Sequence, residues 1–248
     1  MIECKELCAF YGNTQVLDRI SFSLSPGELV AVVGKNASGK TTFLRSLLGT
    51  MKKSTGETTL DGVSITSLSR LDIARKIAYL PQHIEPTSLS VLETVLMGRY
   101  PHLSYPRIFR SRDREIAQEA MAKLGLIAYR DTPVCELSGG FARRCALASA
   151  LATESDYLFL DEPTTFLDIA STLDFLATLH HLARDGKGIL VVLHDLPLAL
   201  RFADRIAVLD GTRLVALDTP DALFQSGLLN QIFDITLYRA ENGVYYIG

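Results

Sequence analysis

The stretch LVAVVGKNASGKTTFLRSLLG, residues 29–49, decides the fold of this 248-residue chain. It opens with five apolar residues, a pattern typical of a strand buried on both faces of a parallel sheet. After a loop at Gly34–Gly39 it continues as a helix that places Phe43 and Leu44 on one apolar side. A loop of this kind turns successive N–H groups inward, and the helix that follows adds partial positive charge. The stretch therefore predicts a nucleotide-phosphate site.

Two side chains of this loop bring chemistry that the backbone cannot supply. Lys40 can reach the β- and γ-phosphates of a nucleotide, and the hydroxyl of Thr41 can ligate Mg²⁺. The residues expected to contact the nucleotide here are Gly34, Lys35, Asn36, Ala37, Ser38, Gly39, Lys40, Thr41 and Thr42.

Other short apolar runs predict further buried strands, separated by segments with helical spacing, which favours a mostly parallel α/β sheet. The runs lie at 29–33, 77–80, 157–160, 189–193 and 205–209. Residues 16–24 alternate instead, and Asp61-Gly62 is a hairpin signal, so we expect a small antiparallel layer beside the main sheet. Residues 84–153 carry helical patterns such as 91–98 and 114–125. The expected division is a core of 1–83 with 154–248 and an inserted helical lobe of 84–153.

Composition narrows the function. The net charge of −3 gives no general attraction to nucleic acid. The four cysteines are Cys4, Cys8, Cys135 and Cys145; none forms a CxxC pair, so reduced thiols are expected. The N-terminus lacks the pattern of a signal peptide, and no apolar run reaches 18 residues. We therefore expect a cytoplasmic protein that meets a membrane only through a partner.

Polar residues follow several predicted strands, at the edge where open α/β sheets bind ligands. In YLFLDEP, residues 157–163, Asp161 suits Mg²⁺ and Glu162 could orient the attacking water. His194 and Gln82 also come just after strands. An acid pair at a strand end or a lone histidine is often merely structural, but together these residues predict one polar rim around one phosphate.

A second phosphate-type helix start lies in CELSGGFARRCALASAL, residues 135–151. Ser138 is a good helix cap, and Gly139 and Gly140 open the backbone ahead of a helix. Either the chain binds two nucleotides, or two copies enclose each nucleotide between unlike faces in a symmetric dimer.

With these motifs in this order, nearly the whole chain resembles an ATP-binding cassette (ABC) ATPase, a P-loop NTPase with a RecA-like core. Residues 34–42 are similar to the Walker A loop, and residues 137–140 to the family signature. The resemblance assigns Gln82 to the Q-loop, with a part in Mg²⁺ binding, and Asp161 and Glu162 to the Walker B pair. It assigns Asp168 to the end of the D-loop at 164–168 and His194 to the switch histidine. Tyr11 is expected to stack on adenine.

The resemblance also implies partners. It implies MgATP hydrolysis in a head-to-tail dimer, with Ser138 and Gly140 of one copy completing the site of the other. Residues 98–103, 80–83 and 194–205 look like cassettes that energise import of iron–siderophores, haem or cobalamin. Such a subunit works at the inner face of the cell membrane, with separate permease subunits and a substrate-binding protein.

Several positions depart from the family pattern. Phe141 replaces the usual Gln after the signature, and we expect it to weaken ATP-driven dimer closure because its ring cannot form hydrogen bonds. Ser149 stands where Arg is common. Lys35 and Ala37 replace Pro and Gly inside the loop, and Lys35 is expected to point to solvent.

Two other functions were weighed against a transporter ATPase. A cassette acting on DNA or ribosomes would usually carry a coiled-coil insert or a second cassette, and a P-loop kinase would leave residues 137–140 unexplained. The arginines at 107, 110, 112 and 114 are most simply a solvated face, although anionic head groups or an acidic partner loop could bind them.

Overall fold

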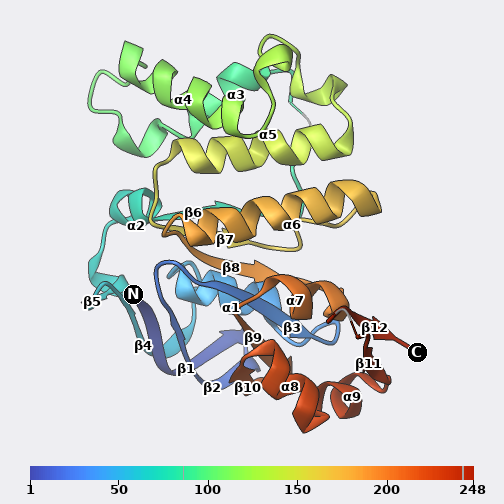
Figure 1. Ribbon diagram of the computed structural model, residues 1–248. Coiled ribbons are helices and arrows are strands. Elements are labelled where there is room, and N and C mark those ends of the chain that lie inside the picture. The colour runs from blue at the N-terminus through green and yellow to red at the C-terminus, as the bar shows by residue number, and fades with distance from the viewer. Residues whose placement is uncertain (86, 242) are drawn as a thin grey trace. The chain divides into compact units, whose positions relative to one another are not determined.

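The computed structural model describes residues 1–85, 87–241 and 243–248. It divides into two compact units, one formed by Met1–Leu68 with Leu176–Gly248 and the other by Ser69–Phe175 (Figure 1). The division falls inside helix α6 (Ile169–Arg184). No helix among the described residues is long and apolar enough to cross a bilayer.

The first unit contains the antiparallel layer that the sequence predicts. Its strands, in spatial order, are β2 (Thr14–Leu24), β1 (Ile2–Tyr11), β4 (Ser54–Leu60) and β5 (Val63–Ser64). Leu60 pairs with Val63, so Asp61-Gly62 forms the predicted two-residue hairpin turn. The alternation on β2 places Leu17, Ile20 and Phe22 in the core, which explains why one face of this layer is apolar.

The same unit holds four strands of the main, mostly parallel sheet. They run in the order β10 (Arg213–Asp218), β9 (Arg205–Asp210), β3 (Leu29–Gly34) and β8 (Gly188–Val192). β3 pairs in parallel with both β8 and β9, and β10 adds an antiparallel edge. Every residue of β3 and β8 is buried, as the uninterrupted apolar runs predict. The mostly parallel α/β fold is therefore confirmed.

Helices and a small hairpin complete this unit. Helix α1 (Lys40–Leu47) packs against β1, β2 and β3 through Phe43 and Leu44, both fully buried. The other elements are the 3₁₀ turn η1 (Ile65–Ser67), α7 (Leu196–Phe202), α8 (Pro220–Ser226), α9 (Leu228–Phe233), β11 (Leu237–Arg239) and β12 (Tyr245–Ile247).

The second unit combines a parallel strand pair with a layer of helices. Strands β6 (Ile77–Leu80) and β7 (Tyr157–Leu160) pair in parallel. Helices α3 (Val91–Met97), α4 (Ser111–Lys123) and α5 (Gly139–Ala152) pack on one another, as Figure 1 shows. The remaining elements are α2 (Arg70–Lys76) and the short turns η2 (Tyr100–His102), η3 (Ile127–Tyr129) and η4 (Val134–Glu136).

A buried ion pair connects the loop after α3 to the start of α4. The guanidinium Nε of Arg99 lies 3.1 Å from Oδ1 of Asp113, and both side chains are largely buried. Arg99 also donates to the carbonyl oxygen of Ala152 at 2.7 Å and to Glu154 at 2.8 Å. Burial raises the pKa of Asp113, but the hydrogen bonds from the Arg110 N–H and from Arg99 outweigh it and lower the pKa.

We expect Asp113→Ala to lower the free energy of unfolding by about 3 kcal/mol, because it removes the buried counter-ion of the Arg99 guanidinium and leaves only the half-exposed Glu154. Urea denaturation measures this loss. Because the folded pKa lies below the unfolded value of about 3.9, the stabilisation by Asp113 is present above that pH and disappears as pH falls through the folded pKa.

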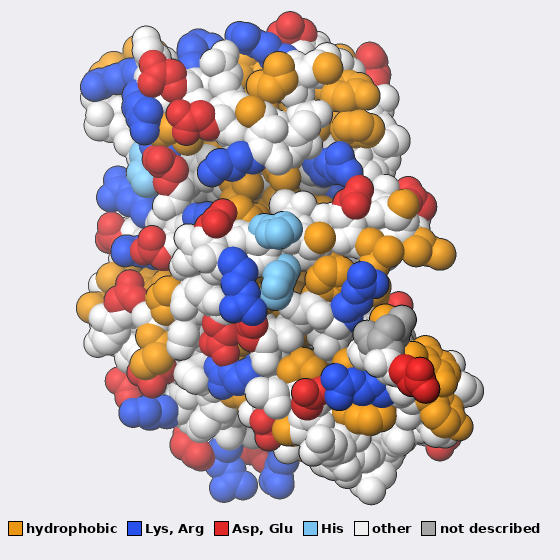
Figure 2. All heavy atoms as spheres, viewed as in Figure 1, with side chains coloured by type: hydrophobic (Ala, Val, Ile, Leu, Met, Phe, Trp, Pro, Cys, Tyr) orange, Lys and Arg blue, Asp and Glu red, His pale blue; other side chains and the backbone are white. Residues whose placement is uncertain are grey.

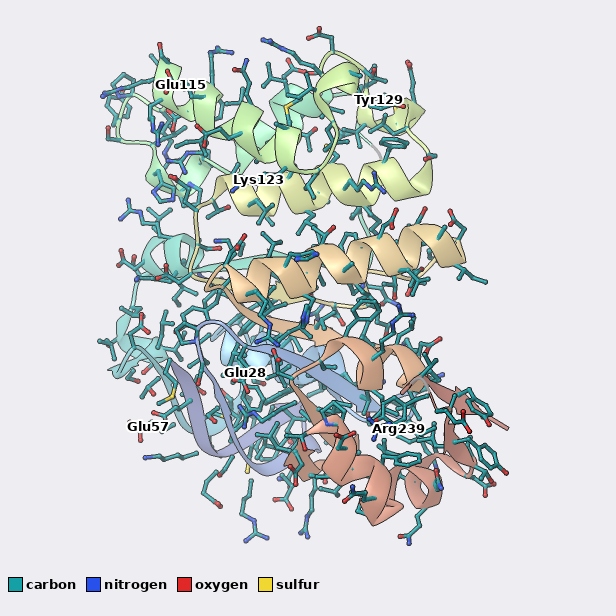
Figure 3. All side chains as sticks on the ribbon, viewed as in Figure 1. Glu28, Glu57, Glu115, Lys123, Tyr129 and Arg239 are labelled. Atoms are coloured by element: carbon teal, nitrogen blue, oxygen red, sulfur yellow. The ribbon has the colours of Figure 1, made fainter. Side chains whose placement is uncertain are left out.

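The matched control is Glu115→Ala in the same helix. Glu115 forms an exposed ion pair with Arg112 at 3.5 Å, so its loss should cost less than about 0.5 kcal/mol (Figure 3). Equal destabilisation by the two variants would show that the buried pair has no special structural role.

Candidate nucleotide site

The phosphate loop connects the buried strand β3 to helix α1 within the first unit. Gly39 has a φ of 88°, a left-handed conformation that suits glycine. A Cβ at Gly34 would lie 2.4 Å from the carbonyl oxygen of Leu209 and 2.5 Å from Oγ of Ser38. The close approach of β9 explains why a side chain is excluded at Gly34, and the left-handed turn at Gly39 sets the direction in which α1 begins.

Buried polar side chains of the loop match what a phosphate requires. Lys40 is only 6% exposed, and its Nζ donates to the carbonyl oxygens of Gly34 at 2.9 Å and Lys35 at 3.0 Å. The hydroxyl Oγ of Ser38 is buried and has no hydrogen-bond partner among the described residues. A buried hydroxyl without a partner costs free energy. The ammonium group and this hydroxyl therefore fit a bound anion at the N-terminus of α1.

The other loop side chains differ in exposure. Lys35, Asn36 and Ala37 are exposed, in agreement with the expectation that Lys35 points to solvent. Thr42 is buried, and its carbonyl oxygen accepts a hydrogen bond from Oγ of Ser46 at 2.7 Å. The adjacent Thr41 is partly exposed at the first turn of α1.

Two more candidate residues belong to the first unit. Tyr11 ends β1 and is 50% exposed, so its ring has a face available to a ligand. His194 follows β8 and is exposed. The next residue, Asp195, caps α7 by accepting a hydrogen bond from the N–H of Leu198 at 2.9 Å. This cap fixes the turn that carries His194.

The two acids of the candidate site lie directly after β7 in the second unit. Asp161 is 2% exposed, and its N–H donates to the carbonyl oxygen of Leu80 at 2.9 Å. Tyr79 donates to Oδ2 of Asp161 at 3.3 Å. Glu162 has a φ of 48°, an uncommon conformation for a residue other than glycine, and its Oε2 accepts a hydrogen bond of 2.5 Å from Nε2 of Gln82. The parallel strands thus place Gln82 and Glu162 side by side.

The Gln82 turn is held by a residue that the sequence analysis missed. Buried Arg143 of α5 donates to the carbonyl oxygens of Pro81, at 3.2 Å, and Gln82. Burial lowers the pKa of its guanidinium. The sequence contained one signal, an arginine four residues after Gly139 on a helix that is otherwise rich in alanine and leucine.

Among the described residues, no group of three or more His, Cys, Asp or Glu side chains could hold a metal by itself. Mg²⁺ binds through one or two protein groups and completes its shell with substrate phosphates and water. Asp161 and Thr41 suit that role by their chemistry, and neither belongs to a preformed cage.

The start of α5 carries the signature-like residues. Ser138 occupies the N-cap position and is exposed, but no side-chain hydrogen bond caps the helix there. The cap position was predicted correctly, whereas the expected side-chain cap does not form. The ring of Phe141 packs 4.5 Å from that of Tyr129, and the guanidinium carbon of Arg144 lies 5.5 Å from the Phe141 ring. Figure 3 labels Tyr129 on the turn beside α5.

Asp168 is rigidly placed before α6. It accepts hydrogen bonds from the N–H and Oγ of Ser171, both at 2.8 Å, and these bonds lower its pKa.

Between the loop at residues 165–167 and α5 lies a hollow of about 300 Å³. Among the residues that line the hollow are Gln82, Ile84, Cys135, Leu137, Arg143 and Phe166.

The four cysteines are all free thiols, as expected. Burial raises the pKa of Cys4 to about 12 and that of Cys145 to about 11. These two thiols are therefore not reactive at neutral pH.

Comparison with known families and proteins gives consistent results. Residues 17–165 match the family model described as ABC transporter. The chain is 36% identical to the petrobactin import ATP-binding protein of Bacillus anthracis, covering 94% of this chain and 86% of that protein. It is 41% identical to the hemin import ATP-binding protein of Nocardia farcinica, covering 88% and 76%.

Solved structures agree in fold. One, of a transporter described as of the metal-chelate ABC type in an inward-facing conformation, superposes with a TM-score of 0.84 at 25% identity and covers 99% of this chain and 95% of that chain. A nucleotide-free ATP-binding cassette superposes with a TM-score of 0.85 at 22% identity, over 94% of this chain and 97% of that one, and shows the fold alone.

Proposed function

Because the chain belongs to the ABC transporter family as an ATP-hydrolysing, ATP-binding protein, we propose that it energises the import of an iron–siderophore, haem or a related metal chelate through a separate membrane permease. The observation that carries this proposal is 36% and 41% identity, over most of both chains, to import ATP-binding proteins for petrobactin and hemin. No relative named above acts on nucleic acid or ribosomes, so that alternative has no support.

At the site, we assign the phosphates of ATP to the loop Gly34–Thr42. Lys40 exchanges its two carbonyl partners for phosphate oxygens, and Ser38 gains the partner that its buried hydroxyl lacks. Tyr11 stacks on the adenine ring through its exposed face. Mg²⁺ would neutralise phosphate charge, with Thr41, Asp161 and Gln82 as its candidate ligands.

Glu162 is our candidate for the group that activates the attacking water. The hydrogen bond from Gln82 fixes the carboxylate of Glu162. It would also place Gln82 close to the same phosphate that the water activated by Glu162 would attack. His194 is assigned to the γ-phosphate, because it follows β8, the strand that pairs with the loop strand β3. In these roles the residues position the phosphate and the attacking water and stabilise charge, and none forms a covalent bond, as in other phosphoryl transfers.

We propose that each site is completed by a second copy of the chain. The N-terminus of α5, with Ser138, Gly139 and Gly140, is exposed. Its N–H groups and helix dipole can therefore bind a phosphate of the ATP that the second copy holds. Asp168, held by Ser171, would line the same seam. ATP then favours the closed dimer, and hydrolysis removes that preference.

Phe141 should weaken this closure, as its position after the signature suggests. Its ring packs on Tyr129 and offers no hydrogen-bonding group to the seam. We expect Phe141→Gln to tighten ATP-dependent dimerisation about fivefold, the worth of about one hydrogen bond. Sedimentation equilibrium in ATP measures this, with Phe141→Leu as the control that should leave the affinity unchanged. Equal affinities for wild type and Phe141→Gln would remove the hypothesis.

The permease is proposed to dock at the hollow beside Gln82, because a contact there would connect a membrane partner to the Gln82–Glu162 hydrogen bond. Ile84 lines the hollow and is partly buried. Docking there would hold the chain peripherally at the inner face of the membrane, where a substrate-binding protein would deliver the cargo to the permease from the opposite side.

The test is purification of the tagged chain from detergent-solubilised membranes. A polytopic membrane protein should copurify with wild type, whereas Ile84→Glu should lose it and retain the ATP hydrolysis of the isolated chain. Reconstituted into vesicles with that partner, the wild type should drive ATP-dependent uptake of a metal chelate. Recovery of the chain with ribosomes or nucleic acid instead would contradict the proposal.

A further inference from the structure

The segment at residues 104–114, between η2 and the first turn of α4, has an unusual charge for this chain. It carries Arg107, Arg110, Arg112 and Arg114 against a single acid, Asp113, although the chain as a whole has a net charge of −3. All four arginines are exposed. In Figure 2, blue Lys and Arg side chains gather at the upper left of the picture, over the part of the chain that leads into α4. We call residues 104–114 the arginine segment.

Large apolar side chains project from the same segment. Tyr105 is 96% exposed and Ile108 is 65% exposed, and the neighbouring Tyr100 is 43% exposed. Exposed apolar groups that lie together commonly mark an interaction surface rather than a solvated face. The arginine segment therefore combines positive charge with apolar groups, as interfacial membrane-binding elements do.

Hydrogen bonds and an ion pair hold the C-terminal end of the arginine segment in place. Asp113 at its end is held by Arg99, and it also accepts a hydrogen bond from the N–H of Arg110 at 2.9 Å. The N–H of Ile108 donates to the carbonyl oxygen of Pro106 at 2.8 Å. The buried pair thus ties the end of the segment, at Asp113, to Arg99, which lies before η2, while most of the residues between them stay exposed.

Few acidic groups neutralise the arginines locally. Arg107 packs over the ring of Tyr100 at 4.7 Å, and Arg112 lies 3.5 Å from Glu115 in an exposed pair. Neither Arg110 nor Arg114 forms a salt bridge with a residue that the structure describes, although the positive charge of Arg110 helps to lower the pKa of Asp113. The one acid within the segment is already engaged by buried Arg99, so most of the positive charge is available to an outside anion.

We propose that the arginine segment binds anionic phospholipid head groups at the membrane surface. Guanidinium groups bind phosphate through paired hydrogen bonds, and tyrosine and aliphatic side chains favour the boundary between head groups and acyl chains. An acidic protein loop would account for the arginines alone. Tyr105 and Ile108, exposed among them, favour lipid. The contact would orient the chain against the membrane independently of its nucleotide site.

The experiment is cosedimentation of the purified full-length chain with vesicles of phosphatidylcholine, with and without 30 mol% phosphatidylglycerol, a composition of about one-third anionic lipid. Wild type should sediment with the anionic vesicles, less so at higher salt, and not with the neutral ones. The variant with Arg107, Arg110, Arg112 and Arg114 all changed to Gln should bind about a hundredfold more weakly or worse, since each arginine near the surface contributes about fivefold and four are removed.

Two further variants separate the causes. Changing Lys5, Lys52, Arg70 and Lys123 to Gln alters the net charge equally at exposed positions elsewhere, and it should leave binding unchanged. Tyr105→Ser with Ile108→Ser should reduce binding while the ATP hydrolysis of every variant stays at the wild-type rate. Equal binding of wild type to neutral and anionic vesicles, or equal losses in both charge variants, would overturn the proposal. So would a variant without the four arginines that still binds vesicles but no longer copurifies with the permease; that result would favour an acidic protein loop as the partner.

Discussion

Glu162→Gln is expected to bind ATP with an affinity within about threefold of wild type and to lose at least about a hundredfold in turnover. The amide keeps the size of the side chain and can still take part in a hydrogen bond with Gln82, so the turn after β7 should survive. It cannot accept a proton from the attacking water at neutral pH, which removes the base but not the binding groups.

Steady-state phosphate release and a fluorescent ATP analogue measure the two quantities separately. Glu119→Gln is the control, because Glu119 is an exposed acid of the same unit on α4, outside the candidate site, and its turnover should stay at the wild-type level. If Glu162→Gln hydrolysed ATP at the wild-type rate, Glu162 could not be the base. If it failed to bind ATP, the separation of binding from chemistry would be wrong.

Lys40→Ala should weaken ATP binding at least about thirtyfold, the second large effect. Lys40 is buried in the loop, and its ammonium group bonds the loop carbonyls of Gly34 and Lys35, at the place where we propose that the phosphates bind. Removing a charged donor from a buried ion contact costs far more than removing one from the surface.

Lys35→Ala provides the matched control within the same loop. Lys35 carries the same charge five residues earlier but is exposed, so its removal should change ATP affinity by less than about threefold. Isothermal titration calorimetry measures the ATP affinity of both variants. It shows whether the buried position of Lys40 or only the positive charge of the loop determines that affinity. Equal losses would mean that the loop attracts ATP only by its net charge, and no loss in either would show that ATP binds elsewhere.

Much of the fold follows from local pattern. The runs at 29–33, 77–80, 157–160, 189–193 and 205–209 became β3, β6, β7, β8 and β9, because strands buried on both faces need uninterrupted apolar sequence. The edge strand β10 and the hairpin of β11 and β12 were not predicted. They are exposed on one side or very short, and their pattern carries little apolar signal.

The candidate site was predictable as a set of residue types and not as a set of contacts. Nothing in the sequence indicates that Lys40 bonds its own loop carbonyls, that Gln82 bonds Glu162, or that Arg143 holds the Gln82 turn. These contacts join residues that are far apart along the chain or depend on one rotamer. The helical lobe at residues 84–153 stays a prediction.

The composite site that we propose makes one demand that the single chain cannot meet. In that proposal, two copies bring Ser138 of one to the ATP bound at Lys40 of the other. An arginine at position 138 would place a bulky side chain at the exposed start of α5 without disturbing the loop of its own chain. The double variant Glu162→Gln with Ser138→Arg should therefore still bind ATP and fail to dimerise.

The most direct measurement is the mass of Glu162→Gln in solution by light scattering, with and without ATP. We predict that the mass rises from the 27.3 kDa of one chain to twice that value when ATP is added, and that it stays at 27.3 kDa when Ser138→Arg is also present. A mass of 27.3 kDa in saturating ATP, or a dimer that Ser138→Arg leaves intact, would contradict a site completed by a second copy.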